Sequence, residues 1–313
     1  MLSNKKQKLT IGLPVYNGEE FIRSRLENIL SQTFQDFHLI ISDNCSEDET
    51  SKICQEFVSK DDRIHYYKQN ENIGGIKNYQ FVLDNVETEY FVFATHDDMW
   101  EETFLEKNIL ALDQNSLIVG SISKIVWTGK NIPNSSDISI QDSVFQKHYK
   151  NFKKKFQHYG VNSITEKTFE KRSVNFLRQL QTQNPSFALY SVFRTDALQK
   201  SIKPQKHDQN FYHSFWNNVC INVLEYGCIN LIDEVLLYYN ADGGGSGVTP
   251  ITQFKKNQIS LVQCIIPWST QITWLIQKFG FKFFIKNFSD FFKLFFMGQV
   301  TFFLSLYKEL KNK

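Results

Sequence analysis

The first 125 residues alternate short apolar runs with amphipathic stretches, and this alternation constrains the fold more than any other feature. Runs with strand composition occur at residues 9–15, 38–42, 64–68, 89–95 and 117–125. Between them, apolar residues recur at helical spacing at residues 19–32, 46–58, 76–86 and 105–112. Repeated β-α units predict an α/β fold, with a mostly parallel sheet covered by helices on both faces. Ligands of such sheets bind beyond the carboxyl ends of the strands.

The second half is less regular. Residues 126–170 combine a Pro, Asn and Ser stretch with Lys and aromatic residues, which indicates an insertion over the ligand face. Strands are predicted within 184–194, 228–232 and 234–239, with short and long helices at 197–200 and 208–226. The glycine-rich residues 242–247 form a loop, and residues from 252 onward have helical character.

Composition excludes several classes of protein. Hydrophobic residues make up 42% and charged residues 22% of the 313, which argues against intrinsic disorder. A net charge of only +2 argues against a nucleic-acid partner. Five cysteines without a C-x-x-C pair argue against a disulfide framework or a zinc site. The polar residues 1–8 and the lack of an uncharged stretch of about 20 residues predict a cytoplasmic protein.

Two adjacent carboxylates, Asp97 and Asp98, directly follow the fourth predicted strand. Carboxylate oxygens suit Mg²⁺ or Mn²⁺, which enter sites built from one or two carboxylates and substrate phosphates. The alternative is that one of them caps a helix beginning near Glu101. His96 is expected to pack at the strand end rather than to bind metal.

Polar segments also follow the first three strands. Residues 43–46 (Asp-Asn-Cys-Ser) can hydrogen-bond a base or a ribose, or can form an Asx turn. Residues 14–18 offer backbone groups and a tyrosine ring to a ligand, or form an ordinary β-α turn. The glycines of residues 72–75 precede a helix, where an anion is favoured. Neither a G-x-G-x-x-G nor a P-loop motif is present.

Taken in order, these motifs resemble the family 2 glycosyltransferases with the GT-A fold. The residues that carry the resemblance are Leu13–Asn17, Ser31–Phe34, Ile40–Asp48, Asn72–Gly74 and His96–Asp98 with Trp100. It extends over residues 1–125 and again over 185–248. The resemblance implies a GT-A catalytic domain at 1–248, with a nucleotide-binding half (1–125) and an acceptor half (126–248). Residues 249–313 would then be a helical C-terminal extension.

By that resemblance, the chain holds a sugar nucleotide and a divalent cation, Mn²⁺ or Mg²⁺. Asp97 is assigned to ribose or metal and Asp98 to metal. The chain departs from the family pattern at Asn44, where a second Asp is common, and at Thr95, which takes the place of the first Asp of an Asp-x-Asp motif. The residues expected to bind the donor nucleotide are Pro14, Tyr16, Asn17, Asp43, Asn44, Asn72, Gly74 and Asp97.

The catalytic base of inverting members is a carboxylate near the start of a helix after the acceptor-side strand. Asp208 matches that position. The alternatives are that Asp208 only caps the helix, or that His207 is the base. Asp196 is expected to cap the short helix 197–200.

The resemblance implies a metal-dependent inverting glycosyltransferase of polysaccharide or surface-glycan synthesis. The donor would be a nucleotide diphosphate sugar, with uridine favoured, and the acceptor a saccharide or lipid-linked saccharide. A nucleotidyltransferase is the first alternative, although residues 13–19 lack its Gly- and basic-rich signature. The second is a non-catalytic sugar-nucleotide-binding or scaffold protein, against which the retained carboxylates argue.

The C-terminal segment 279–306 is unusually rich in phenylalanine, with 11 between Phe279 and Phe303. On a helix, Lys282, Lys286 and Lys293 fall opposite the apolar face, which predicts peripheral contact with the inner face of an anionic membrane. The alternatives are packing on the catalytic domain or a homo-oligomer interface. The predicted apolar face consists of Phe281, Phe284, Ile285, Phe288, Phe291, Phe292 and Phe295.

Overall fold

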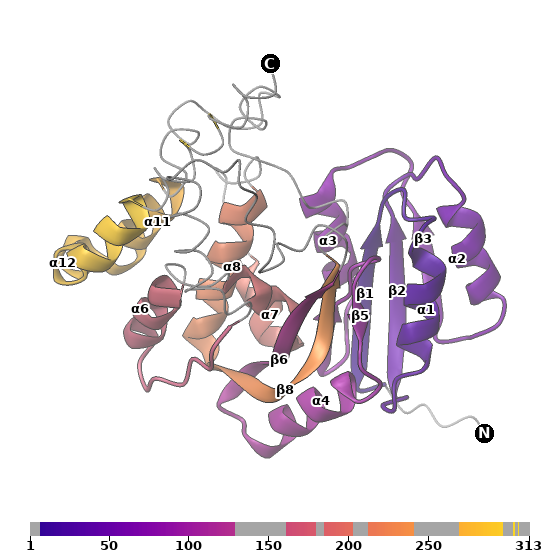
Figure 1. The fold of residues 1–313 in the computed structure, drawn as a ribbon, viewed down its shortest axis with the longest axis horizontal. Helices are drawn as coiled ribbons and strands as arrows, with labels where there is room; N and C mark the ends of the chain where they lie inside the picture. The colour runs from indigo at the N-terminus through magenta and orange to yellow at the C-terminus, as the bar shows by residue number, and fades with distance from the viewer. Residues whose placement is uncertain are drawn as a thin grey trace, which may run out of the picture.

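The structure is a computed structural model that describes residues 7–128, 161–179, 185–202, 212–240 and 269–296, together with 303 and 306. Its strands form one eight-stranded sheet in the order β3-β2-β1-β4-β7-β6-β8-β5 (Figure 1). The strands are β1 Leu9–Val15, β2 Phe37–Asp43, β3 Ile64–Lys68, β4 Tyr90–Phe93, β5 Met99–Trp100, β6 Ile118–Thr128, β7 Val192–Arg194 and β8 Cys228–Asn240.

Helices cover both faces of this sheet. They are α1 Ile22–Leu30, α2 Thr50–Val58, α3 Gly75–Asp84, α4 Phe104–Gln114, α6 Phe169–Gln179, α7 Thr195–Ser201, α8 Tyr212–Tyr226, α11 Ser269–Phe279 and α12 Phe281–Lys286, with a 3-10 helix η1 at Pro185–Tyr190. One apolar cluster joins β1 to α1, α2 and α4, and a second joins β4 to α3, α7 and α8. The predicted α/β architecture is therefore confirmed.

The four strands of the N-terminal half are parallel, as predicted. β1 pairs with β2 and β4, and β2 pairs with β3. All seven residues of β1 are buried, because helices cover it on both sides. The carboxyl ends of β1 and β2 are in register, with Val15 opposite Asp43, so the segments that follow them begin at the same edge of the sheet.

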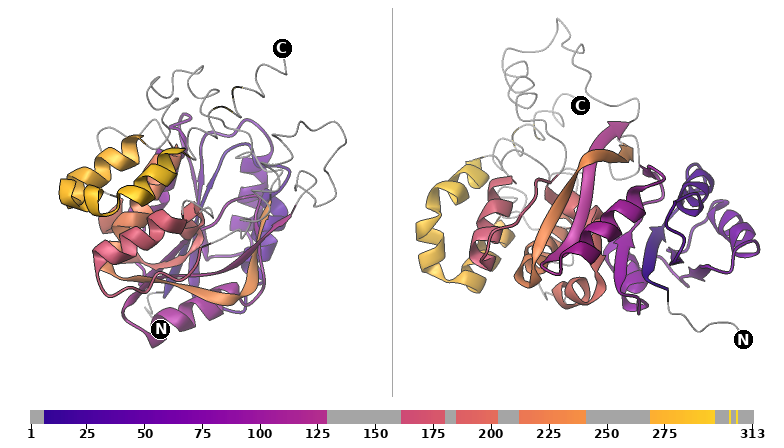
Figure 2. Two further views of the ribbon diagram at one scale, coloured as in Figure 1. Left: turned by 60° about the vertical axis from the view of Figure 1, so that its left-hand side comes forward. Right: turned by 90° about the horizontal axis from the view of Figure 1, so that it is seen from below.

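The C-terminal half adds antiparallel strands to the sheet. β7 is antiparallel to β4 and β6, while β6 and β8 form a long, bent parallel pair (Figure 2). The prediction of one strand within 184–194 was wrong for residues 185–190, which form η1. The two predicted strands at 228–239 are one continuous β8, and neither α6 nor β5 was predicted.

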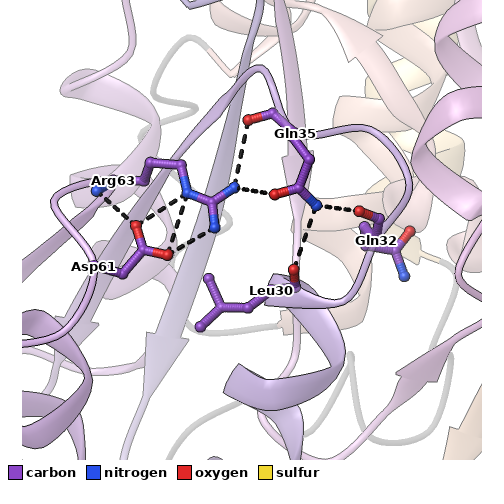
Figure 3. Close-up of polar contacts among 5 residues, drawn as sticks. All are labelled: Leu30, Gln32, Gln35, Asp61 and Arg63. Carbon is purple, nitrogen blue, oxygen red and sulfur yellow. Dashed lines mark hydrogen bonds and ion pairs between the residues drawn. The ribbon is translucent and has the colours of Figure 1, made fainter.

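A polar network lies at the amino ends of β2 and β3, at the edge of the sheet opposite the carboxyl ends. Arg63 Nη1 donates to Gln35 Oε1 at 2.6 Å, and its Nη2 contacts Asp61 Oδ2 at 2.7 Å. Gln35 Nε2 in turn donates to the carbonyl oxygens of Leu30 and Gln32 at the end of α1 (Figure 3). This network fixes α1 to the sheet far from the carboxyl ends, so we assign it a structural role.

The C-terminal helices pack on α6 and α8. Lys278 of α11 contacts Glu225 at 2.9 Å, and the Phe279 and Phe169 rings lie 5.0 Å apart. Gly280, at φ 81°, separates α11 from α12, and α12 ends at Lys286. The predicted apolar helical face from Phe281 to Phe295 is therefore divided at Asn287 between two helical stretches, 281–286 and 288–296. Phe291, placed on the predicted exposed face, is instead 2% exposed. The predicted domain boundary at 248 falls outside the described residues.

Candidate active site

Side chains of the segment after β2 fix the loop after β1. Asn17 N donates to Ser46 Oγ at 2.9 Å, and Glu47 N donates to Asn17 Oδ1 at 3.0 Å. Asn17 adopts φ 49°, a conformation that asparagine tolerates better than most residues. Tyr16 is left exposed beside this turn, while Pro14 is buried. The loop after β1 thus presents one aromatic ring from a rigid backbone.

Asn44 extends these contacts to the loop after β3. Its Nδ2 donates to Asn72 Oδ1 at 2.9 Å, and its Oδ1 accepts from Ile73 N at 2.9 Å. Asn72 Oδ1 also accepts from Gly74 N at 3.0 Å, and Gly74 adopts φ 82°. Asn44 uses its amide as both donor and acceptor, which the carboxylate common at this position in the family could not do. The substitution therefore has a structural basis.

Asp43 is fully buried, and both of its oxygens accept hydrogen bonds from the protein. Ser46 N donates to Oδ1 at 2.8 Å and the Tyr66 hydroxyl donates to Oδ2 at 2.6 Å. The turn expected as an alternative at residues 43–46 is therefore formed. These contacts favour a supporting role for Asp43 beneath the loops that face the ligand edge.

The segment after β4 carries the two carboxylates. Asp98 is 1% exposed, and its Oδ1 accepts from Asn240 N at the end of β8 at 2.8 Å. The Thr95 hydroxyl donates to Asp98 Oδ2. Helix α4 begins only at Phe104 with Thr103 as its N-cap residue, so the capping alternative for Asp97 and Asp98 was wrong.

The loops after β1 and β4 approach each other closely. A Cβ atom at Gly18 would lie 2.7 Å from Val15 Cγ2 and 3.0 Å from His96 Cδ2. Only glycine fits this position without displacing a neighbour. Together with the β1–β2 and β2–β3 contacts, this approach brings the predicted donor residues and the carboxylates to one edge of the sheet.

The carboxylate pair is held in an unfavourable electrostatic environment. Burial, followed by the charge of Asp97, raises the pKa of Asp98 from 3.8 to about 6. Burial likewise raises the pKa of Asp97. The pKa of the neighbouring His96 is lowered, again chiefly by burial. Two partly desolvated carboxylates side by side favour a cation or a proton between them.

Arg25 of α1 is fully buried beside the carboxylates and was not among the predicted site residues. Its Nε donates to Thr95 O at 2.9 Å, its Nη1 donates to Asn28 Oδ1 at 2.9 Å, and its guanidinium lies 4.0 Å from the Trp100 ring centroid. Burial lowers the pKa of Arg25 to about 10, against the attraction of Asp98 and Asp97. A charged residue on the apolar face of α1, next to Leu26, was the signal that could have revealed it.

Asn28 of α1 also holds the backbone that follows β4, at Trp100. Its Nδ2 donates to Trp100 O at 2.7 Å, and its Oδ1 accepts from Trp100 N at 3.0 Å. Gln32, just beyond the end of α1, donates to Glu101 O at 2.9 Å. The Ser-Gln-Thr-Phe motif at 31–34 therefore helps to anchor the segment that follows the carboxylates.

Aromatic rings gather where β6, β8 and η1 meet, close to the Asn240–Asp98 contact. Tyr239 lies 5.1 Å from both Trp127 and Phe187, measured between ring centroids, and 6.3 Å from Tyr190. Trp127, Tyr190 and Tyr239 are half-buried. They form a partly accessible aromatic surface near the carboxylates.

Several predicted site residues lie outside the described part of the chain: Asp208 and His207, the loop 242–247, and most of the insertion 126–170. Asp196 was expected to cap α7, but the N-cap residue is Arg194, and Asp196 forms an ion pair with Lys200 at 3.1 Å. Among the described residues, no group of three or more His, Cys, Asp or Glu side chains is placed to hold a metal.

The sequence matches the profile of glycosyl transferase family 2 over residues 10–179. The chain belongs to this family. The matched residues include all four parallel strands of the N-terminal half and the carboxylate pair, which confirms the resemblance seen in the motifs. Membership in this family favours a glycosyltransferase over the nucleotidyltransferase alternative.

Two curated relatives illustrate the similarity. A GalNAc(5)-diNAcBac-PP-undecaprenol beta-1,3-glucosyltransferase of Campylobacter jejuni is 28% identical over 221 residues, or 61% of this chain and 67% of that protein. The putative teichuronic acid biosynthesis glycosyltransferase TuaG of Bacillus subtilis is 31% identical over 108 residues, or 34% of this chain. The match spans 43% of TuaG, so less than half of that protein is represented here.

Among solved structures, residues 1–349 of S. aureus TarS in complex with UDP-GlcNAc have a similar fold. The TM-score is 0.55 at 19% identity, and the match covers 79% of this chain and 64% of the TarS chain. This likeness establishes a GT-A-type fold for the chain, including its mixed sheet.

Proposed function

We propose that this chain transfers a sugar, with inversion, from a uridine diphosphate sugar to a hydroxyl of a saccharide or lipid-linked saccharide in surface-glycan synthesis. The observation that carries this proposal is the Asp97–Asp98 pair, with Asp98 buried and Asp97 partly buried, set at the same sheet edge as the loops after β1, β2 and β3. Three comparisons support it. TuaG is named for teichuronic acid synthesis, the C. jejuni relative for a polyprenol-linked acceptor, and TarS was solved with UDP-GlcNAc.

In this proposal the nucleotide lies against the exposed Tyr16 ring and the loop that Asn44 and Asn72 fix. The amides of residues 75–77, the first of α3, would face the anionic part of the donor, because the first amides of a helix have no partner within the helix. The amides of Ile73 and Gly74 instead donate to the side chains of Asn44 and Asn72. Asp43 acts from below, by holding Ser46 and therefore Asn17 in place. The donor would thus meet a surface that is already formed.

A divalent cation fits the carboxylate pair. Each oxygen of Asp98 accepts one hydrogen bond from Thr95 or Asn240, so each keeps a second lone pair for a ligand. Among the described residues two carboxylates lie side by side here, so these would provide a part of the coordination shell that Mg²⁺ or Mn²⁺ completes with phosphate oxygens and water. The bound ion would supply positive charge to the leaving diphosphate.

The acceptor side of the site would be formed by Trp127, Tyr190 and Tyr239. Flat rings with polar edges suit a sugar, because they cover its apolar C–H face and leave its hydroxyls free to bond. Asp208, assigned from the family resemblance, would accept the proton of the attacking hydroxyl. Arg25 and Asn28 would keep the carboxylates aimed at the donor through their contacts with Thr95 and Trp100.

The deciding experiment is a transfer and donor-hydrolysis assay with a panel of UDP-sugars, run with Mn²⁺ and with EDTA. We expect UDP release with at least one UDP-sugar, stimulated by the metal and lost in Asp98→Asn. A protein that binds UDP-sugars in a thermal-shift assay, yet releases no UDP with any donor or acceptor preparation, would support the non-catalytic alternative instead.

A further inference from the structure

The helical residues 281–296 carry a continuous row of exposed large apolar side chains. Each is between 55% and 63% exposed, and they follow one another at intervals of three or four residues along two successive helical stretches, 281–286 and 288–296. We call this row the outer face. It consists of Phe281, Ile285, Phe288, Phe292 and Phe296.

The opposite side of the same segment is fixed to the rest of the protein. Phe283, Phe291 and Leu294 are buried in the main apolar cluster. Asp290 is nearly buried and pairs with Arg178 of α6 at 3.2 Å, while Lys286 contacts Glu170 at 2.9 Å. The segment is therefore a rigid part of the described structure, with one side already packed and the outer face exposed. In Figures 1 and 2, α11 and α12 lie at the end of the molecule opposite α2.

Within residues 281–296 the exposed charged side chains are all basic, and one of them, Lys286, pairs with Glu170 of α6. Lys282 and Lys293 are exposed among its phenylalanines, and Lys286 is exposed at its edge. Asp290 is the only acidic residue between 281 and 296, and it faces inward. The basic side chains thus flank an apolar row that extends over about four turns.

We propose that the outer face docks on an anionic lipid bilayer. Shallow insertion of the phenylalanines would place Lys282 and Lys293 at the level of the headgroups, as in helices that lie in the interface. A second copy of the chain is a poorer occupant, because a two-fold contact through this face would bring like-charged lysines together. Among the described residues, no helix is long and apolar enough to cross a membrane. The inference goes beyond the proposed function and does not depend on it.

Vesicle co-sedimentation of the full chain tests this inference without any sugar donor. We expect binding to vesicles of equal parts phosphatidylglycerol and phosphatidylcholine, weaker binding to phosphatidylcholine alone, and a several-fold loss between 0.1 and 0.5 M salt. Phe288→Ser/Phe292→Ser should lower the partition coefficient at least tenfold, because it removes two large apolar side chains from the inserted face. Lys282→Glu/Lys293→Glu should also lower it at least tenfold, since one lysine near an anionic leaflet contributes roughly fivefold.

Matched control variants change the same properties elsewhere. Leu110→Ser/Leu117→Ser removes two equally exposed apolar side chains, and Lys52→Glu/Lys60→Glu reverses two exposed charges at the far end of the molecule. Both should bind vesicles within twofold of the unchanged protein. Wild-type protein that stays in the supernatant with anionic vesicles would overturn the proposal. A dimer in sedimentation velocity that Phe288→Ser/Phe292→Ser dissociates, without vesicle binding, would also overturn it and assign the face to self-association.

Discussion

The carboxylate Asp98 should stabilise the metal-bound protein and destabilise the metal-free one, and Asp98→Asn separates the two effects. The substitution removes the charge but keeps the contacts, because the amide oxygen can accept from Asn240 N and the amide nitrogen can donate to Thr95 Oγ. Any change in stability therefore reports the charge rather than lost hydrogen bonds.

The magnitude follows from the raised pKa. Between pH 3.8 and about 6, the unfolded chain releases the Asp98 proton while the folded chain keeps it, so the free energy of unfolding falls as pH rises. A difference of about two pH units corresponds to at most about 3 kcal/mol, complete above pH 7. At pH 4.5 only about 1 kcal/mol of that loss has occurred. Without metal, Asp98→Asn should thus be more stable at pH 7.5, with a melting temperature roughly 5 °C higher.

The assay compares thermal melts of the two proteins in EDTA at pH 7.5 and 4.5, and again with Mn²⁺ and UDP at pH 7.5. Ligand at about 1,000 times its Kd adds about 4.1 kcal/mol to the wild type, which exceeds the loss of at most about 3 kcal/mol, and the variant should gain far less, so the order of stability reverses. Turnover of the variant should fall at least 100-fold.

Asp113→Asn is the control of opposite sign. Although Asp113 is partly buried, hydrogen bonds from Lys8 and Tyr90 lower its pKa, so its loss should destabilise the protein at pH 7.5. An Asp98→Asn protein that melts lower than wild type by the same amount at both pH values in EDTA would refute the reasoning.

Four further substitutions test separate parts of the site. Arg25→Met should lower the free energy of unfolding in EDTA by about 3 kcal/mol, measured by thermal melts, because it leaves the buried Asp98 and the neighbouring Asp97 without their cation. Asn44→Ala should raise the donor KM about tenfold at unchanged kcat, since it releases Asn72; an equal fall in kcat would contradict a donor-only role. Trp127→Ala should raise the acceptor KM about tenfold and leave donor affinity, measured by calorimetry, unchanged. Asp208→Asn should keep donor binding and lose at least 100-fold in transfer rate, and weakened UDP binding would reassign Asp208 to the donor side.

The N-terminal half was predictable because burial and periodicity agree there. A run such as Leu9–Val15 is apolar throughout, which is typical of a strand covered on both faces, and the structure buries every one of its residues. The strand ends could then be placed at one edge from topology alone. The placement of Asp97 and Asp98 followed from this edge rule without knowledge of any contact.

The remaining features depend on tertiary contacts that no local pattern encodes. The apolar residues Phe187–Leu189 lie in a 3-10 helix rather than a strand, since a short apolar run does not by itself distinguish the two. Arg25 supports the site by donating to the carbonyl oxygen of Thr95, which lies 70 residues away in the sequence. The phenylalanines of 281–296 surround the helix, so the sequence alone could not say that Phe283 and Phe291 face the core and Phe288 faces outward.

Thr95 links the Arg25 guanidinium to the Asp98 carboxylate, and in the proposed function this link accounts for the absence of the first acidic residue of the usual motif. Its carbonyl accepts from Arg25 and its hydroxyl donates to Asp98, two contacts that an ionised aspartate at position 95 could provide only in part. With Asp97 and Asp98 ionised and Arg25 protonated, the formal charge of the cluster is −1, and a divalent cation would bring it to +1. A third carboxylate would bring the same metal-bound cluster to neutrality. With Thr95 in place of an acidic residue, the metal-bound cluster would therefore present a net positive charge to the diphosphate of the proposed donor. The positive side chain that contributes to this charge is Arg25, which is buried in α1 and does not occupy the open part of the site.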